Sequence, residues 1–337
     1  MTLIAYRPKL DTLRAIAILL VLLSHWLGDC NLIKIPIVKK SGVLGVNLFF
    51  VISGYLITNN LMVLYAKYPF GEALKTFIMK RVLRLFPALY MFLAIVFLVQ
   101  FLTGFWVVNK YSDLLWYLFY VPNFFILEHG WIYPSINNLW SLAVEEQFYL
   151  LWPFVIYIFR KQLIPVLIII IVAGLFFITL FDNINTAKLF PMGNFNYLAG
   201  GALLAVYSGR INIIKSMAIV AAALVAIYFI PSKIAVDCLT ALIFVLITGI
   251  FCSELPPFFE KIFNIGLVKY IGKISYGIYL YHRFIVFFLY GMNIKFNWGI
   301  SDIAIFCLLF PITFYVAHLS YKYYESYFLK IKDKKFA

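Results

Sequence analysis

The sequence contains little charge for its length. Only 12% of its 337 residues are Asp, Glu, Lys or Arg, and 64% are hydrophobic. Soluble domains carry roughly 25% charged residues, so we expect lipid to be the solvent for most of the surface of this chain. The sequence also lacks Pro/Gly/Ser-rich linkers, low-complexity tracts and internal repeats. These absences predict a single membrane domain over residues 1–337.

Acidic residues and cysteines are also scarce. The 14 acidic residues are outnumbered by 28 basic ones, which gives a net charge of +14. The basic residues lie in short segments between apolar runs, where positive charge sets membrane orientation, so we expect no nucleic-acid partner. The four cysteines show neither metal-type nor disulfide-type spacing. We expect them to be small buried hydrophobic residues, and we expect no metal site.

Long apolar runs dominate the remainder of the sequence. A helix needs about 20 residues to cross the hydrocarbon core of a membrane. The sequence therefore predicts an all-α polytopic protein of about ten transmembrane helices. A shorter apolar segment, 114–127, is interrupted by Pro122 and Asn123 and is a possible re-entrant segment. The ten predicted spans are 11–29, 43–64, 85–105, 138–159, 163–181, 190–208, 213–231, 234–252, 268–291 and 301–325.

The distribution of basic residues indicates the orientation. If segment 114–127 does not cross and the N-terminus is cytoplasmic, 19 of the 28 Lys and Arg residues lie on the cytoplasmic side. Arg7, Lys9 and Arg210 are among them, whereas Lys34 and Lys40 belong to a cluster that runs against the rule. The positive-inside rule thus favours ten spans with both termini in the cytoplasm.

Ionisable residues inside the first span are the first candidates for function, because such residues are costly in lipid. Arg14 and His25 are eleven residues apart. Eleven residues are about three helical turns, so both side chains are expected on one face, roughly 16 Å apart along the axis. With a cytoplasmic N-terminus, Arg14 lies near the cytoplasmic end and His25 in the outer half. The pair suits a long ligand with an anionic head and a reactive end.

Other intramembrane polar residues extend this set. Arg81 and Arg84 open the third span on one helical face and could bind phosphate, because a guanidinium presents a fork of donors. Glu145 lies at a depth similar to that of His25 and could orient its imidazole as a general base. Further polar residues that could line a substrate cavity are Asp11, Ser53, Tyr276, Tyr279 and His282.

Six sequence blocks, in order, resemble the membrane acyltransferase family 3. The first runs from Leu10 to His25 and contains the Arg-x10-His pair, and the second is Gly45–Thr58. The third is Arg81-x-x-Arg84 followed by Pro87. The remaining blocks are Trp140–Tyr149 with Pro153, Ile274–His282 and Tyr323–Glu325. The resemblance covers nearly the whole chain.

This resemblance implies an enzyme that takes an acyl group, usually acetyl, from acyl-CoA on the cytoplasmic face. It implies transfer to a hydroxyl of a glycan or lipid-linked glycan, such as O-antigen, capsule or exopolysaccharide, at a bacterial cytoplasmic (inner) membrane. Acetyl-CoA is then a substrate, and no bound cofactor is expected. The family's activity-linked residues correspond to Arg14, His25, Arg81 and Arg84, and its glutamate corresponds to Glu145.

The sequence departs from the family pattern in two places. Asn47 stands where relatives often have Asp, and Arg283-Phe284 replaces the usual aromatic-Pro after His282. The chain also lacks the esterase-like domain of some members, so we expect the membrane domain to complete the transfer. Direct transfer and a covalent acyl-His25 step both remain open. Two other classes also remain open: a transporter or flippase of a glycolipid with a His/Glu proton relay, and a structural or sensory membrane protein.

Overall fold

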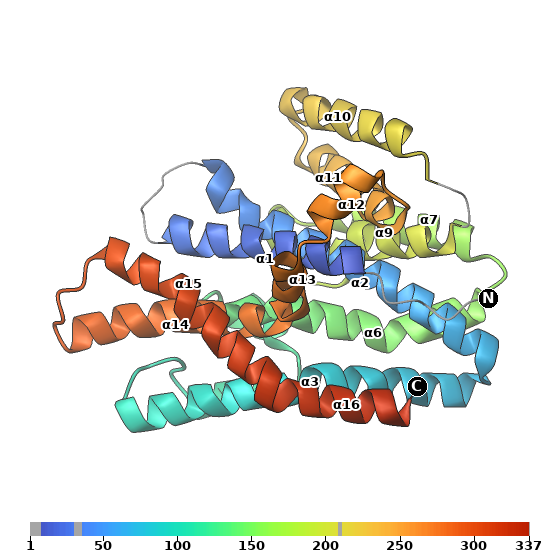
Figure 1. Cartoon of the computed structure of the whole chain (residues 1–337). Coiled ribbons are helices and arrows are strands. Elements are labelled where there is room, and N and C mark those ends of the chain that lie inside the picture. The colour runs from blue at the N-terminus through green and yellow to red at the C-terminus, as the bar shows by residue number, and fades with distance from the viewer. Residues whose placement is uncertain (1–7, 30–35, 208–210, 337) are drawn as a thin grey trace. The chain divides into compact units, whose positions relative to one another are not determined.

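The computed structural model describes residues 8–29, 36–207 and 211–336 (Figure 1). Within these ranges every regular element is a helix, which confirms the predicted all-α class. Arg7, Cys30, Lys34 and Arg210, on which some of the sequence predictions rest, lie outside the described residues.

Each of the ten predicted spans overlaps a helix. Their bounds are α1 Pro8–Asp29, α2 Pro36–Lys67, α3 Phe70–Thr103, α6 Trp140–Ile158, α7 Leu163–Thr179, α9 Phe195–Val206, α10 Ile213–Phe229, α11 Lys233–Cys252, α14 Ser275–Lys295 and α15 Asp302–Leu319. The shorter elements between and after them are η1 Tyr111–Asp113, α4 Leu114–Leu118, α5 Pro122–His129, η2 Asn137–Leu139, α8 Ile184–Lys188, η3 Met192–Asn194, α12 Pro257–Phe263, α13 Gly266–Lys273, the π-helical segment η4 Ser320–Glu325 and α16 Ser326–Lys335.

Five helical segments in the described part of the chain are long and apolar enough to cross a membrane. They are Pro8–Leu27, Lys40–Lys67, Phe70–Thr103, Lys233–Cys252 and Asp302–Lys335. Helices α7 and α10 are strongly apolar but have 17 residues each. The protein is therefore helical with five candidate spans, and the count of ten stays a prediction.

The ambiguous segment 114–127 is not one continuous helix. It is divided between α4, with five residues, and α5, with eight. At about 1.5 Å per residue, neither helix is long enough to cross about 30 Å of hydrocarbon. Between them Tyr120 has a φ of 56°, a left-handed conformation that interrupts a helix.

The described residues form two compact units that alternate along the chain. Unit 1 contains 8–17, 44–73 and 144–273, and unit 2 contains 18–43, 74–143 and 274–337 within the described ranges. In unit 1, α9 packs against both α7 and α11, and α11 packs against α10. In unit 2, α14 packs against α15.

Glycines bring α2 and α9 of unit 1 into close backbone contact. A Cβ added to Gly54 would lie 1.9 Å from the Leu198 carbonyl oxygen. A Cβ added to Gly201 would lie 2.1 Å from the Val51 carbonyl oxygen and 2.9 Å from the Tyr55 nitrogen. Small residues at helix crossings allow such approach and strengthen packing where lipid supplies little hydrophobic driving force. These two positions therefore require glycine.

A buried polar cluster joins α8, α9 and α11 in unit 1. Asp237 accepts hydrogen bonds from Lys188 (2.8 Å), Asn196 (2.7 Å) and the Tyr197 hydroxyl (2.6 Å). The Lys188 ammonium also lies 4.7 Å from the centre of the Tyr197 ring. A buried charge is tolerated when it is paired and hydrogen-bonded, and this carboxylate has both kinds of partner.

We expect Gly201→Ala to destabilise the protein by about 1–3 kcal/mol, because the new methyl group overpacks the α2–α9 crossing. The matched control is Gly71→Ala, since a Cβ at Gly71 in α3 meets nothing within 4 Å. Thermal unfolding in detergent measures both variants. A Gly201→Ala protein as stable as the Gly71→Ala protein would contradict the described crossing.

Candidate functional site: a histidine pair

Two histidines from distant parts of the sequence meet in unit 2. His25 is on α1 and His282 is on α14, and Nδ1 of His25 lies 2.8 Å from Nε2 of His282. The ring centroids are 5.1 Å apart and the ring planes differ by 14°. His282 is completely buried and His25 is half-buried. The structure thus joins two of the site residues that the sequence analysis selected separately.

The hydrogen bonds of the pair define which nitrogens carry protons. His282 Nδ1 lies 2.8 Å from the carbonyl oxygen of Tyr279. A carbonyl only accepts, so Nδ1–H of His282 is the donor and Nε2 of the neutral ring is the acceptor. His25 then donates from Nδ1 to His282, and Nε2 of His25 keeps its lone pair. This is the arrangement of an oriented general base.

The start of α6 and the preceding η2 turn support this arrangement. The Asn138 amide donates a 2.8 Å hydrogen bond to the Tyr279 carbonyl oxygen, the same atom that accepts from His282. In return, the Tyr279 hydroxyl donates to the Asn138 carbonyl at 2.8 Å and lies 2.7 Å from the Ser141 hydroxyl. All three residues are buried. The carbonyl that fixes the His282 tautomer is therefore itself held in place.

Gly42 allows α2 to lie close to His25. A Cβ on Gly42 would be 2.9 Å from both Cβ and Oγ of Ser24, and 3.9 Å from Nε2 of His25. The absent side chain lets α2 pack directly against Ser24, close to the nitrogen that bears the lone pair. Any larger residue at position 42 would have to displace part of α1.

The two arginines of α3 also belong to unit 2. The Arg81 guanidinium lies 5.8 Å from the centre of the Phe77 ring. Arg84 is within electrostatic range of Glu325, and both arginines are within electrostatic range of Lys332 on α16. Arg81, Arg84 and Lys332 thus bring three cationic groups near one another, with the Glu325 carboxylate beside Arg84.

Arg14 and Asp11 lie in unit 1, where they form an ion pair. The Arg14 Nη1 atom is 3.1 Å from Oδ1 of Asp11, one helical turn earlier on α1. Asp11 is buried and Arg14 is half-buried. Arg14 and His25 share the continuous helix α1, which agrees with the predicted first span.

Glu145 has hydrogen-bond donors on both carboxylate oxygens. Within unit 1, the Ser53 hydroxyl donates to Oε1 at 2.9 Å and the Tyr149 hydroxyl donates to Oε2 at 3.2 Å. Ser53 and Glu145, two of the predicted site residues, are thus brought together. Because Glu145 and His25 belong to different units, the predicted contact between them stays a prediction, as does a phosphate site shared by Arg14, Arg81 and Arg84.

Several residues that support the site were not predicted from the sequence. Asn138, Ser141 and Gly42 hold or border the histidine pair, and none of them was a candidate. Tyr276 was a predicted site residue, and its hydroxyl donates a hydrogen bond to the Leu85 carbonyl at 2.9 Å. The available signal for Asn138 was a polar residue at the start of a predicted span. Its hydrogen-bond acceptor, the backbone carbonyl of Tyr279, is 141 positions away, and no sequence pattern connects the two.

Comparison with known proteins gives clear matches in sequence. A family model described as an acyltransferase domain matches residues 7–322. The Listeria monocytogenes peptidoglycan O-acetyltransferase OatA is 31% identical over 98% of this chain, and a "Putative O-acetyltransferase" of Staphylococcus aureus is 28% identical over 96%. The chain spans 58% of the length of each of these two relatives. No solved structure gives a match.

The tautomers of the histidine pair can be tested by nitrogen NMR, because the protein has only four histidines. With ¹⁵N-labelled histidine, we expect His25 and His282 both to be protonated at Nδ1. Replacing His282 with alanine should remove the preference at His25 and leave the signals of His129 and His318 unchanged. A His25 protonated at Nε2 in the native protein would contradict the described pair.

Proposed function

Because the chain belongs to the acyltransferase domain family, which it matches over residues 7–322, we propose that it is an O-acetyltransferase. It takes an acetyl group from acetyl-CoA on the cytoplasmic side and transfers it to a hydroxyl group of a glycan. The observation that carries this proposal is the hydrogen-bonded pair of His25 and His282, because its hydrogen bonds leave the lone pair of His25 Nε2 able to accept a proton.

In this proposal the donor is held by its phosphates. Arg81 and Arg84 bind phosphate oxygens near the cytoplasmic end of α3, and Arg14 contributes from α1. Guanidinium groups form strong, directional hydrogen bonds with phosphate. The Asp11 carboxylate, 3.1 Å from Arg14, restricts the orientation of that guanidinium. The pantetheine arm extends toward His25, which is eleven residues further along α1.

The chemical step then uses His25 as the base. Nε2 of His25 takes the proton of the acceptor hydroxyl while the oxygen attacks the thioester carbonyl carbon. The resulting tetrahedral species breaks its C–S bond. The thiolate of CoA leaves and takes the proton from His25, so the imidazole is neutral again at the end of the cycle. His282 keeps Nδ1 of His25 occupied, so that Nε2 remains the nitrogen that handles the proton.

The acceptor is a glycan hydroxyl reached from the outer side of the membrane. The relative from Listeria monocytogenes is named a peptidoglycan O-acetyltransferase, so peptidoglycan is the first acceptor to test. Capsule, exopolysaccharide and O-antigen units offer the same hydroxyl chemistry. The working topology is ten spans with both termini in the cytoplasm, which puts the phosphate-binding end and the hydroxyl-accepting end on opposite sides.

We expect His25→Ala to lower glycan O-acetylation by about two to four orders of magnitude, because positioned general bases contribute that much. His282→Ala should cause a smaller loss, since Nε2 remains but its ring is less well oriented. His318→Ala, on α15, is the control and should acetylate normally. Acetate released from purified glycans by mild alkali measures all three. If His25→Ala left acetate unchanged but stopped glycolipid movement, the protein would be a transporter instead.

The donor site predicts a second result. We expect Arg81→Met and Arg84→Met each to raise the KM for acetyl-CoA about tenfold or more, as loss of a charged hydrogen bond does. The KM for S-acetyl-pantetheine, which has no phosphate, should not change. Lys75→Met, an exposed position earlier on α3, is the matched control. Equal effects on both donors would remove these arginines from phosphate binding.

A further inference from the structure

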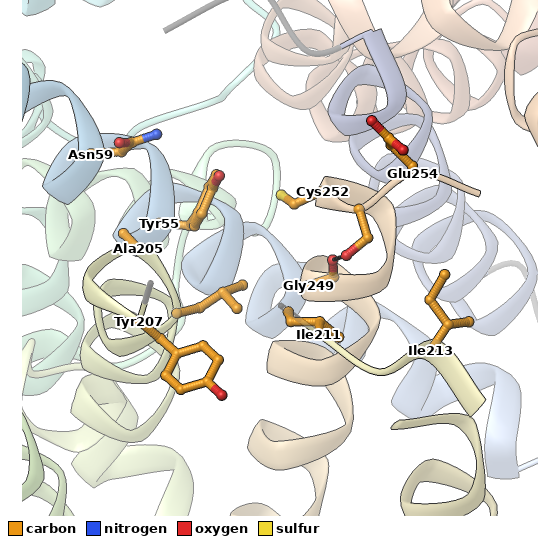
Figure 2. A pocket seen from close by; sticks show the side chains of 11 residues that line it. Tyr55, Asn59, Ala205, Tyr207, Ile211, Ile213, Gly249, Cys252 and Glu254 are labelled. Carbon is orange, nitrogen blue, oxygen red and sulfur yellow. Dashed lines mark hydrogen bonds between the residues drawn. The ribbon is translucent and has the colours of Figure 1, made fainter. Parts of the chain in front are cut away.

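Unit 1 contains a pocket of about 550 Å³ that the proposed function does not use. In Figure 2, Asn59 and Cys252 lie on opposite sides of this pocket. Tyr207 and Ile211 also line it, and residues 208–210 between them lie outside the described ranges. The described residues therefore do not define the charge of this pocket. In unit 2, by contrast, a described arginine lies at the histidine pair.

Arg283 brings a positive charge to the histidine pair. It follows His282 on α14, and its guanidinium is within electrostatic range of both His25 and His282. The Arg283 side chain is half-buried, and all three residues belong to unit 2. An arginine keeps its proton in proteins, so the proposed base works beside a permanent positive charge.

The segment from the end of α5 to η2 fixes the position of this charge. Nε of Arg283 donates a hydrogen bond to the carbonyl oxygen of Pro134. Further along this segment, Asn138 donates to the Tyr279 carbonyl oxygen, which also accepts from His282. One short segment thus holds both the guanidinium and the carbonyl that orients the His282 ring.

Pro134 is itself held in place by its neighbours. Tyr133 and Ser135, which flank it, are buried. The Tyr133 ring stacks on Phe125 with the ring centroids 5.4 Å apart, and the Tyr133 hydroxyl donates to Asp113. Proline also restricts its own backbone. The carbonyl that accepts from the guanidinium therefore belongs to a rigid segment, so the positive charge is in place before a substrate binds.

The proposed reaction develops a negative charge to which no stabilising group has been assigned. As the acceptor oxygen attacks the thioester carbon, its proton goes to His25 and the π electrons of the carbonyl move to the carbonyl oxygen. When the C–S bond breaks, that oxygen returns its electrons to re-form the C=O bond. The sulfur leaves with the bonding electrons and takes the proton from His25. Prepositioned donors aimed at such an oxyanion are usually the largest single contribution to catalysis.

We propose that Arg283 is a further catalytic residue, whose guanidinium donates hydrogen bonds to this oxygen as it becomes negative. The proposal rests on the proposed function, because the oxyanion forms only if an acyl group is transferred. In the tetrahedral species the oxyanion lies near two cations, the guanidinium and the His25 imidazolium, and its charge offsets their repulsion. Before the attack there is no oxyanion, so the guanidinium stabilises the transition state more than the bound substrates.

The test is the Arg283→Met variant of the full-length protein in detergent, with acetyl-CoA as donor and soluble peptidoglycan fragments as acceptor. We expect kcat to fall about 10²- to 10³-fold, as loss of one oxyanion donor does. Both KM values should stay within about twofold of wild type, because the bound substrates carry no oxyanion. The matched control is Arg160→Met, since that guanidinium also lies over an aromatic ring, at 5.4 Å compared with 5.5 Å for Arg283. Its kcat should equal that of the wild type.

Three further measurements separate catalysis from a structural role. Arg283→Lys keeps the charge but not the fork of donors, so its kcat should lie between those of the wild type and Arg283→Met. Methylguanidinium added to Arg283→Ala should restore part of the lost kcat, because it returns the missing group to the space left by the side chain. In the methionine variant, His25 and His282 should both remain protonated at Nδ1 by ¹⁵N NMR.

Several results would overturn the catalytic role of Arg283 and leave the proposed function intact. One is a kcat that Arg283→Met does not lower, including the case in which the acceptor KM rises and Arg283 only binds the acceptor. Another is loss of Nδ1 protonation at the histidine pair in that variant, because Arg283 would then be structural. A lysine variant no faster than the methionine variant, without rescue by methylguanidinium, is a third. In each case the wild type still transfers acetyl and His25→Ala does not. A wild-type protein that transfers no acetyl overturns the proposed function itself.

Discussion

In an apolar interior a polar side chain is stable only when its hydrogen-bonding groups have partners, and His282 meets this constraint in a way that determines its chemistry. Its Nδ1–H is donated to the Tyr279 carbonyl, so its Nε2 can only accept. The acceptor then requires a donor, and Nδ1 of His25 supplies it. The same requirement for partners therefore leaves Nε2 of His25, the nitrogen proposed to act as the base, unprotonated.

Not every buried polar cluster in this protein is a candidate active site. The cluster around Asp237 is as buried as the histidine pair, but its hydrogen bonds join α8, α9 and α11 to one another. The histidine pair differs because its chain of hydrogen bonds ends on His25, which is half-buried and keeps a lone pair on Nε2, instead of closing on itself. This difference, more than burial, separates a structural cluster from a candidate active site.

The sequence predicted that the protein is helical and where ten of its helices lie, because hydropathy is a local property of the sequence. It also selected polar residues inside apolar runs as candidates for function, and these are likewise visible locally. It did not predict that His25 pairs with His282, since 257 positions separate them and no spacing rule connects them. It also proposed Glu145 as the group that orients His25. That role stays a prediction, because Glu145 belongs to unit 1 and His25 to unit 2; within unit 2 it is His282 that accepts the hydrogen bond from Nδ1 of His25.

A neutral orienting group also has consequences for the reaction path. A carboxylate beside a general base stabilises the imidazolium that forms when the base takes a proton. The imidazole of His282 brings no negative charge, so His282 does not stabilise an imidazolium at His25 as a carboxylate would. The proton then passes to the departing thiolate, and because the thiol that forms has a pKa of about 8.5, the thiolate accepts the proton readily at neutral pH. We therefore favour direct transfer, in which His25 carries the proton between oxygen and sulfur and does not hold the acetyl group.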